Sequence, residues 1–559
     1  MTPSRLAIGG GLGGENLPAE PRLSSRAGIG RRTAPILVLL SVGAAALVSI
    51  PLLYVFVRAL DQGWRSYLQA LSAYDGPGLL VRTVLLALGV VALSLAIAVP
   101  MAWLVARTDL PRRKLWGLIG AVPLIFPSYI AAFTLVAVLG PRGYLQQALG
   151  RFGIEALPEI AYGYSGALLA LALFTYPYLY LLLIAAFRES DPALEEASRV
   201  LGHHGWSRFI RVVLPQVRPS LYGGSLLIIL YTLSDFGAVS IVRYNTYTLA
   251  IYNAYRGLFD RTIAASLATA LILLTVAFIA IEVALVRRVR PAPARPRRAL
   301  RPVPLGSWKI PSLVFLSAMA VFTVAIPVGT MLHWGWRALE YGRGAGAVLQ
   351  PALNSVGVAA AAAGVAVVLA LAPAIWSERG RSRMAIVVEK LAAAGFALPG
   401  IVIALALVVF SLRFLPWAYQ TLALLVAAYV IRFLPEAIAA ARSAIAAVPR
   451  ELEEAARVLG RSTMGTLTSV TIPLMRRGIL AGASLVFLTT MKELPATLIL
   501  RPIGFETLAT RIWTTAAEGF YSETAAPALI LLLASALPVY WFVIRPVLSD
   551  RPLADGGKR

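Results

Sequence analysis

Two acidic residues stand inside long apolar segments of the sequence. Asp235 follows LLIILYTLS, and Glu493 follows GASLVFLTTMK, 258 positions further along the chain. Each acid has an oxygen-bearing residue four positions earlier, Tyr231 and Thr489 respectively, which in a helix would share its face. If these segments cross a membrane, an ionised carboxylate costs at least about 2.5–3.5 kcal/mol on insertion scales and should not face lipid. The four residues are therefore candidates for lining a polar path.

The alternative is that each acid is neutralised locally. Lys492 adjoins Glu493 and would be its nearest counter-ion, whereas Arg432 and Glu436, spaced i and i+4, are expected to pair within one helix. A firm metal site is not expected, because the chain has no cysteine and three scattered histidines. These histidines are His203, His204 and His333.

A second pattern occurs twice, each time in a hydrophilic stretch between apolar segments. LEEASRVLG at 194–202 returns as LEEAARVLG at 452–460, and a Leu-Pro or Ile-Pro pair follows each copy at the same spacing. An amphipathic loop resting on the membrane is the simpler interpretation of one copy, but two identical spacings favour a shared role. The positions that match are Glu196, Ala197, Gly202 and Pro215 in the first copy and Glu454, Ala455, Gly460 and Pro473 in the second.

Each copy predicts a short helix, a turn and a second short helix. Asp191 followed by Pro192 is a favourable helix start, and Gly202 offers the positive φ that commonly ends a helix. Pro215 is expected to end the second helix before the next apolar segment begins. One apolar face is predicted to carry Leu194, Ala197 and Leu201.

The elements that must position these residues are membrane spans. The chain is 58% hydrophobic and 14% charged, with a mean hydropathy of +0.76, which is the composition of an integral membrane protein. We predict an all-α polytopic protein of about twelve transmembrane helices. The expected spans are residues 35–57, 80–106, 116–139, 163–187, 221–243, 263–286, 310–332, 354–376, 388–410, 418–441, 478–500 and 524–547.

The repeat and the charge pattern set the organisation of these spans. Six spans separate the two copies of every repeated segment, so the halves run in parallel through the membrane. Basic residues gather in loops on one side, which predicts that both termini are cytoplasmic and that the net charge of +24 does not indicate nucleic acid. The predicted parts are a disordered tail (1–34), a six-helix half (35–286), a basic linker (287–309), a second six-helix half (310–547) and a tail (548–559).

The paired loops resemble the EAA loop of bacterial ATP-binding-cassette (ABC) importer permeases. The resemblance implies the type I permease fold and a cassette ATPase dimer docked at the cytoplasmic face, with Glu196 and Glu454 pairing with the ATPase and Gly202 and Gly460 making the turns. The first copy has Ser198 where the family usually has alanine. No G-x-x-x-x-G-K-[ST] loop occurs, so ATP and Mg²⁺ are expected on the partner, and this chain is expected to be a transport subunit and not an enzyme.

Within this family, KELPATLILRPIGFETLATRIW at 492–513 and SDFGAVSIVRYNTYTLAIY at 234–252 resemble ferric iron permeases. This likeness implies Fe³⁺ as the substrate, a periplasmic binding protein as its donor, a bacterial inner-membrane location and one fused chain per complex. Hard Fe³⁺ prefers oxygen ligands such as carboxylate and phenolate. Thiamine, polyamine and phosphonate permeases share this architecture, and two acids would suit an organic cation equally well.

Two other classes of function compete with an importer permease. A proton-coupled secondary transporter can also have twelve spans in parallel halves, and RTDLPRRK at 107–114 resembles a basic loop of such proteins, but paired EAA loops have no role there. A membrane-embedded enzyme would need a catalytic constellation, and the sequence displays none.

Overall fold

The computed structural model describes residues 35–548 with short gaps, and within them the chain is almost entirely α-helical. The gaps are residues 62, 142, 154–158, 204, 258–259, 288–301, 341–345 and 381. The predicted tail at 1–34 and most of the basic linker thus lie outside the described residues. Within these ranges the β contacts amount to one isolated bridge, between Thr108 and Val303, so the predicted all-α class is confirmed.

Ten helices in the described ranges are long and apolar enough to cross a membrane, and they coincide with ten of the twelve expected spans. They are α1 (Pro35–Leu60), α3 (Gly76–Arg107), α7 (Gly163–Glu189), α10 (Leu214–Ser234) preceded by α9 (Gly205–Arg208), α13 (Arg261–Arg287), α14 (Lys309–Ala320) continued by α15 (Ile326–Glu340), α16 (Gly346–Gly380), α19 (Leu422–Ala446), α22 (Ile472–Met491) preceded by α21 (Thr463–Thr466), and α25 (Tyr521–Pro538).

The other two expected spans, 116–139 and 388–410, are each divided into shorter helices. The first consists of α4 (Arg113–Ala121) and α5 (Ser128–Leu139), and the second of α17 (Arg383–Ala392) and α18 (Gly400–Phe414). The breaks fall at Phe126-Pro127 and Leu398-Pro399, where the residue before each proline has extended backbone (ψ of 125° and 135°). Proline disfavours the helical conformation of the residue before it, which explains both breaks.

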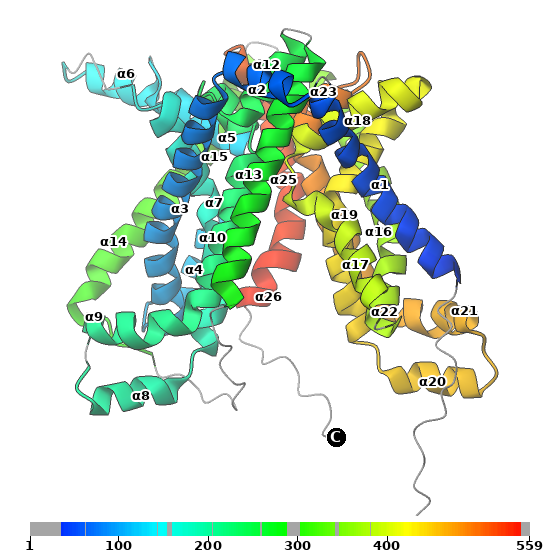
Figure 1. Cartoon of the computed structure of the whole chain (residues 1–559). Helices are drawn as coiled ribbons and strands as arrows, with labels where there is room; N and C mark the ends of the chain where they lie inside the picture. Colours follow the sequence, from blue (N-terminus) through cyan, green and yellow to red (C-terminus); the bar gives the residue numbers. More distant parts are fainter. Residues whose placement is uncertain are drawn as a thin grey trace, which may run out of the picture.

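The first helix of each half packs partly against the other half, besides contacting α13 or α25 (Tyr521–Pro538) of its own half. Helix α1 packs against α16, α17 and α18, which belong to the second repeat. Reciprocally, α14 contacts α4, and α15 contacts α5. In Figure 1, α1 accordingly lies beside the yellow helices, and the light green α14 lies on the side of the blue α3.

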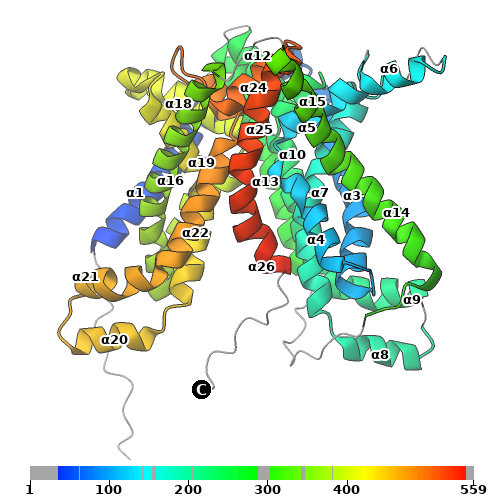
Figure 2. The ribbon, with the colours of Figure 1, turned by 180° about the vertical axis from the view of Figure 1, so that it is seen from behind.

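The two halves pack together at one end of the molecule and diverge toward the other. Figures 1 and 2 show the short helices α2 (Gly63–Ala73), α12 (Tyr247–Arg256) and α24 (Leu508–Ala517) at the packed end. The diverging end carries α8 (Pro192–Val200) with α9 on one half and α20 (Arg450–Val458) with α21 on the other. The twice-repeated loop motif therefore lies at the tips of both halves.

Candidate functional site

The two loop motifs, residues 191–215 and 449–473, each form a helix, a glycine turn and a second helix, as the sequence predicts. The Asp191 carboxylate accepts a hydrogen bond from the Ala193 amide at the start of α8. Gly202 has a φ of +79°, and its counterpart Gly460 has a φ of +84°. Side chains strongly disfavour this region, so the turn depends on glycine in both copies.

The predicted role of Pro215 as a helix end is wrong. Pro215 lies in the first turn of α10, and the helix runs from Gly205 to Ser234 as one span. A π-helical turn precedes each proline, at Phe209–Val213 and at Leu467–Thr471 before Pro473. Because a π turn shifts the hydrogen bonds by one residue, it accommodates the missing amide of proline without ending the helix.

Each motif turns its apolar face outward instead of burying it. Val200 and Val458 are 88% and 87% exposed, and the leucines that follow them are also exposed. The glutamates Glu196 and Glu454 lie on the same helices and are exposed as well, as are Ala197 and Ala455. An exposed apolar surface with a carboxylate beside it, present on both tips, has the composition of a docking surface.

The first glutamate of each motif has a different environment, which the sequence analysis missed. Glu195 is buried, and its carboxylate lies 2.6 Å from the guanidinium of Arg107 at the end of α3. Arg107 also donates to the Ser190 hydroxyl and to the Phe187 carbonyl at the end of α7. This buried ion pair ties α8 to two membrane spans.

The second half repeats this arrangement with Arg379 of α16 and Glu453 of α20. Arg379 Nε lies 3.1 Å from a Glu453 oxygen, and Arg379 also donates to the Ile445 and Val448 carbonyls at the end of α19. Thr471 adds a hydrogen bond of 2.9 Å to Glu453. We call the two ion pairs the clasps. The sequence signal was present, since LEE occurs in both motifs and an arginine ends the second span of both halves.

The structure places the candidate acids at breaks between helices and not within continuous spans. Helix α10 ends at Ser234, Asp235 is extended, and α11 (Gly237–Ile241) follows; likewise α22 ends at Met491, and α23 (Pro495–Leu500) follows Glu493. Gly237 and Pro495 occupy equivalent positions, and each disfavours a continuing helix. Tyr231 and Thr489 lie in the last turn of the helix before each break, so each acid follows its oxygen-bearing residue directly beyond the end of that helix.

The carboxylate of Asp235 caps the start of the short helix α11 that follows it. Its Oδ1 accepts hydrogen bonds from the amides of Ala238 (2.9 Å) and Val239 (3.3 Å), and its own carbonyl accepts one from the Thr248 hydroxyl. Two amides at a helix start are favourable partners for a carboxylate. Asp235 is 7% exposed, and its partners among the described residues include no cation.

Glu493 has a cationic partner, but not the expected one. Arg432 Nε lies 3.0 Å from Glu493 Oε2, while Glu493 Oε1 accepts a hydrogen bond from the Ala496 amide. A Cβ on Gly400 at the start of α18 would overlap both charged groups, so the glycine makes room for this pair. Lys492 instead donates to the Leu124 carbonyl of the other half at 3.3 Å.

The contacts of Thr489, Glu436 and Tyr231 also differ from those expected from the sequence. Thr489 donates to Glu436 at 3.0 Å, whereas the ion pair of Arg432 is formed with Glu493 and not with Glu436. At the equivalent place in the first half, the rings of Tyr178 and Tyr231 are in contact, with centroids 5.7 Å apart. The breaks themselves lie close, because a Cβ on Gly237 would meet Leu494. The described chain nevertheless has no hydrogen bond between Asp235 and Glu493, nor a group of three or more acids or histidines that could hold a metal.

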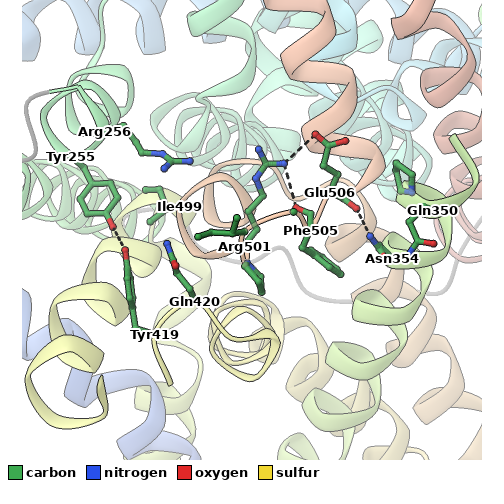
Figure 3. Close-up of a pocket in the computed structure, with 14 residues that line it drawn as sticks. Tyr255, Arg256, Gln350, Asn354, Tyr419, Gln420, Ile499, Arg501, Phe505 and Glu506 are labelled. Atoms are coloured by element: carbon green, nitrogen blue, oxygen red, sulfur yellow. Dashed lines mark hydrogen bonds and ion pairs between the residues drawn. The ribbon is translucent and has the colours of Figure 1, made fainter. Parts of the chain in front are cut away.

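A pocket of about 500 Å³ lies at the packed end, on the seam between the halves (Figure 3). Tyr255 and Arg256 of α12 come from the first half, and the other lining residues come from the second. The hydroxyls of Tyr255 and Tyr419 are 3.1 Å apart across the seam, and burial raises the pKa of Tyr255, so its hydroxyl stays protonated. Arg256 reaches the Leu498 carbonyl at 3.3 Å.

Comparison with known proteins agrees with this architecture. The model of the family described as "Binding-protein-dependent transport system inner membrane component" matches twice, at residues 95–291 and 366–544. The chain is 28% identical to the Fe(3+)-transport system permease protein FbpB 2 of Haemophilus influenzae over 88% of this chain and 94% of that protein.

Two further relatives align with a shorter part of the chain. The sulfate transport system permease protein CysW of Escherichia coli is 30% identical over 36% of this chain and 67% of its own length. The molybdenum transport system permease protein ModB of Escherichia coli is 31% identical over 28% of this chain and 69% of its own length. With two family matches, two helical halves and ten candidate spans, the chain belongs to the family of binding-protein-dependent transport system inner membrane components and is a fused permease of an ABC importer with the type I fold.

Proposed function

We propose that this permease carries ferric iron from a periplasmic binding protein across the bacterial inner membrane. The observation that carries the proposal is the length of the likeness to the Haemophilus Fe(3+) permease, which includes both halves, whereas the sulfate and molybdenum permeases align with less than 40% of the chain. Asp235 and Glu493 would supply hard oxygen ligands near the seam, which suits Fe³⁺.

The proposed orientation places the diverging end in the cytoplasm. This assignment puts both termini, the basic linker and the two loop motifs on the cytoplasmic side, as the positive-inside rule favours. ATP and Mg²⁺ are then bound by a cassette ATPase dimer, and this chain acts as a transport subunit without a catalytic role. One fused chain supplies both tips, so one copy per complex matches a dimeric ATPase.

Glu196 and Glu454 are the proposed contacts with this ATPase. Their exposure supports this role, and so does the exposed apolar surface beside them. Glu195 and Glu453 are turned inward and paired, so they are not available to a partner.

Uptake by the reconstituted importer tests the cargo. The chain, its ATPase and its binding protein are placed in vesicles with internal ATP, and uptake of radioactive ferric citrate, sulfate and molybdate is compared. The proposal expects ATP-dependent iron uptake that needs the binding protein. ATP-dependent uptake of sulfate or molybdate without iron would assign the chain to an oxyanion instead.

A further inference from the structure

The pocket at the packed end has a lining that suits a negatively charged oxygen ligand. Arg256 and Arg501 approach it from opposite halves, with Gln420 below them in Figure 3. An arginine side chain has five N–H donors. Arg256 uses one of them, for Leu498, and the side chain of Gln420 makes no hydrogen bond to another described residue.

The charge of Arg501 is only partly balanced. Glu506 lies 3.7 Å from Arg501, but its other oxygen lies 3.6 Å from Arg511. One carboxylate is therefore shared between two guanidinium groups, and Arg256 has no acidic partner within the described chain. The lining thus carries two guanidinium groups and a single carboxylate, which is a net positive charge.

The backbone at Gln420 reinforces this picture. Its φ is +57°, in the left-handed region that residues other than glycine rarely adopt. The turn that contains it follows Tyr419, whose hydroxyl meets Tyr255 across the seam. Backbone strain of this kind clusters at ligand sites, although Asp75, Arg112 and Arg243 also have a positive φ away from the pocket.

The pocket and the acid at the break lie at opposite ends of one short helix. Helix α23 begins two residues after Glu493, and its outer turn provides Leu498 and the pocket residue Ile499. Six residues of α-helix span about 9 Å, so a ligand in the pocket lies about the length of α23 away from the helix break at Glu493. Movement of the halves that opens the seam would open the pocket toward the path.

We infer that this pocket is an oxyanion site, which receives the oxyanionic part of the cargo before the seam opens. Guanidinium groups bind carboxylate, phosphate, sulfate and molybdate oxygens through paired hydrogen bonds. The oxyanion could be free or could be a ligand of Fe³⁺, and the volume of about 500 Å³ accepts either. The inference rests on the proposed import direction, which places the packed end toward the binding protein.

Calorimetric titration of the permease–ATPase complex in lipid nanodiscs tests the site. The probes are sodium sulfate, sodium molybdate and ferric citrate, each added alone. We expect at least one probe to bind with a dissociation constant below about 1 mM. Binding of ferric citrate without the two simple anions would show that the oxyanion arrives as an iron ligand, and the reverse would show a free oxyanion.

Three variants locate the bound anion. R256Q combined with R501Q is expected to weaken binding at least about tenfold, because both guanidinium groups are lost. Q420E, which leaves both arginines in place and adds a repelling charge, is expected to do the same. R413Q changes an exposed arginine at the same end outside the pocket and should bind as the unmodified protein does.

The inference fails if no probe binds, or if Q420E and the double arginine variant bind as tightly as R413Q. Iron uptake separates this failure from that of the proposed function. Iron uptake without oxyanion binding overturns the site alone. Oxyanion binding without iron uptake leaves the site standing and overturns the proposed cargo.

Discussion

The Nε atom of Arg432 lies 3.0 Å from the Glu493 carboxylate, and this pair joins α19 to the break after α22. Glu493 is 5% exposed at its side chain and Arg432 is 19% exposed, so neither charge is well solvated. Glu493→Gln should therefore lower the melting temperature of the purified permease by leaving Arg432 unpaired. The cost should fall below the roughly 3–5 kcal/mol of a fully buried pair, because water reaches Arg432.

A double-mutant cycle identifies the partner. Arg432→Met should restore part of the stability lost in Glu493→Gln, since it removes the unpaired charge. Lys492→Met is the matched control, because Lys492 donates to Leu124 and not to Glu493. Rescue by Lys492→Met, without rescue by Arg432→Met, would contradict the observed pairing.

Asp235→Asn should reduce iron uptake while expression and ATPase assembly stay near those of the unmodified protein. Asparagine keeps an oxygen that can accept from Ala238 and Val239, so the start of α11 survives while the charge is lost. Asp260→Asn provides the control, because Asp260 accepts from the Thr262 and Ile263 amides in the same manner at another helix start. Equal iron uptake by Asp235→Asn and Asp260→Asn would show that the charge of Asp235 has no role in the transport path.

Charge reversal at Glu196 and Glu454 should weaken association with the ATPase without unfolding the spans. Both residues are exposed on α8 and α20, so lysine is accommodated there but would repel a basic partner. Co-purification of the ATPase measures the effect, with Glu451→Lys on the same helix α20 as the control. Full iron uptake by the double variant would refute a docking role.

The glycine turns of the two loop motifs give a second test of docking. Gly202→Val and Gly460→Val should also impair ATPase assembly, because valine strongly disfavours a φ near +80°. Gly223→Val is the matched control, since no atom lies near its Cβ position and its φ is not positive. Loss of assembly in the control alone would show that the turns do not matter.

The clasps should affect the coupling of ATP hydrolysis to iron uptake more than they affect docking of the ATPase. Arg107→Met leaves Glu195 buried without its cation, which typically costs about 3–5 kcal/mol and should loosen α8 from α3. We expect ATP hydrolysis to continue while iron taken up per ATP falls, and the combined variant with Glu195→Met to recover part of the ratio. An unchanged ratio at normal expression would show that the clasp only stabilises the fold.

Single cysteines on this cysteine-free chain report the orientation. Positions 150 and 518 should react with an impermeant maleimide from the periplasm, and positions 205, 298 and 463 should react from the cytoplasm only. Position 298 lies outside the described residues, whereas the other four are exposed. Glu518 is chosen because it is exposed, whereas Thr515 on the same helix is buried. Reaction at 205 and 463 from the periplasm would invert the orientation.

The parts of this structure that depend on local pattern could be predicted from the sequence. Hydrophobic length located ten spans, and the spacing of Asp191 and Gly202 correctly gave a capped helix with a glycine turn. Helix breaks were harder, because long apolar runs conceal them. Pro127 and Pro399 did mark two of them, but Pro215, equally visible, lies inside a helix that a π turn adapts to it.

Side-chain partners could not be predicted, since they depend on which helices become neighbours. Glu493 adjoins Lys492 in sequence, yet Arg432 reaches it from α19, more than fifty residues away. Likewise, nothing in the local pattern of LEE distinguishes the buried Glu195 from the exposed Glu196. Only the position of α3 beside α8 assigns one glutamate to a clasp and leaves the other for a partner.

The exchange of first helices has a consequence for how this protein is made. Helix α1 leaves the ribosome first and can pack against α13 of its own half, but its partners in the second half begin at Gly346, so at about 5–20 residues per second it waits on the order of 15–60 s for those. Neither half can reach its final packing while the other is unfinished, and a chain cut within the basic linker would yield two fragments that mature only by trading helices with each other.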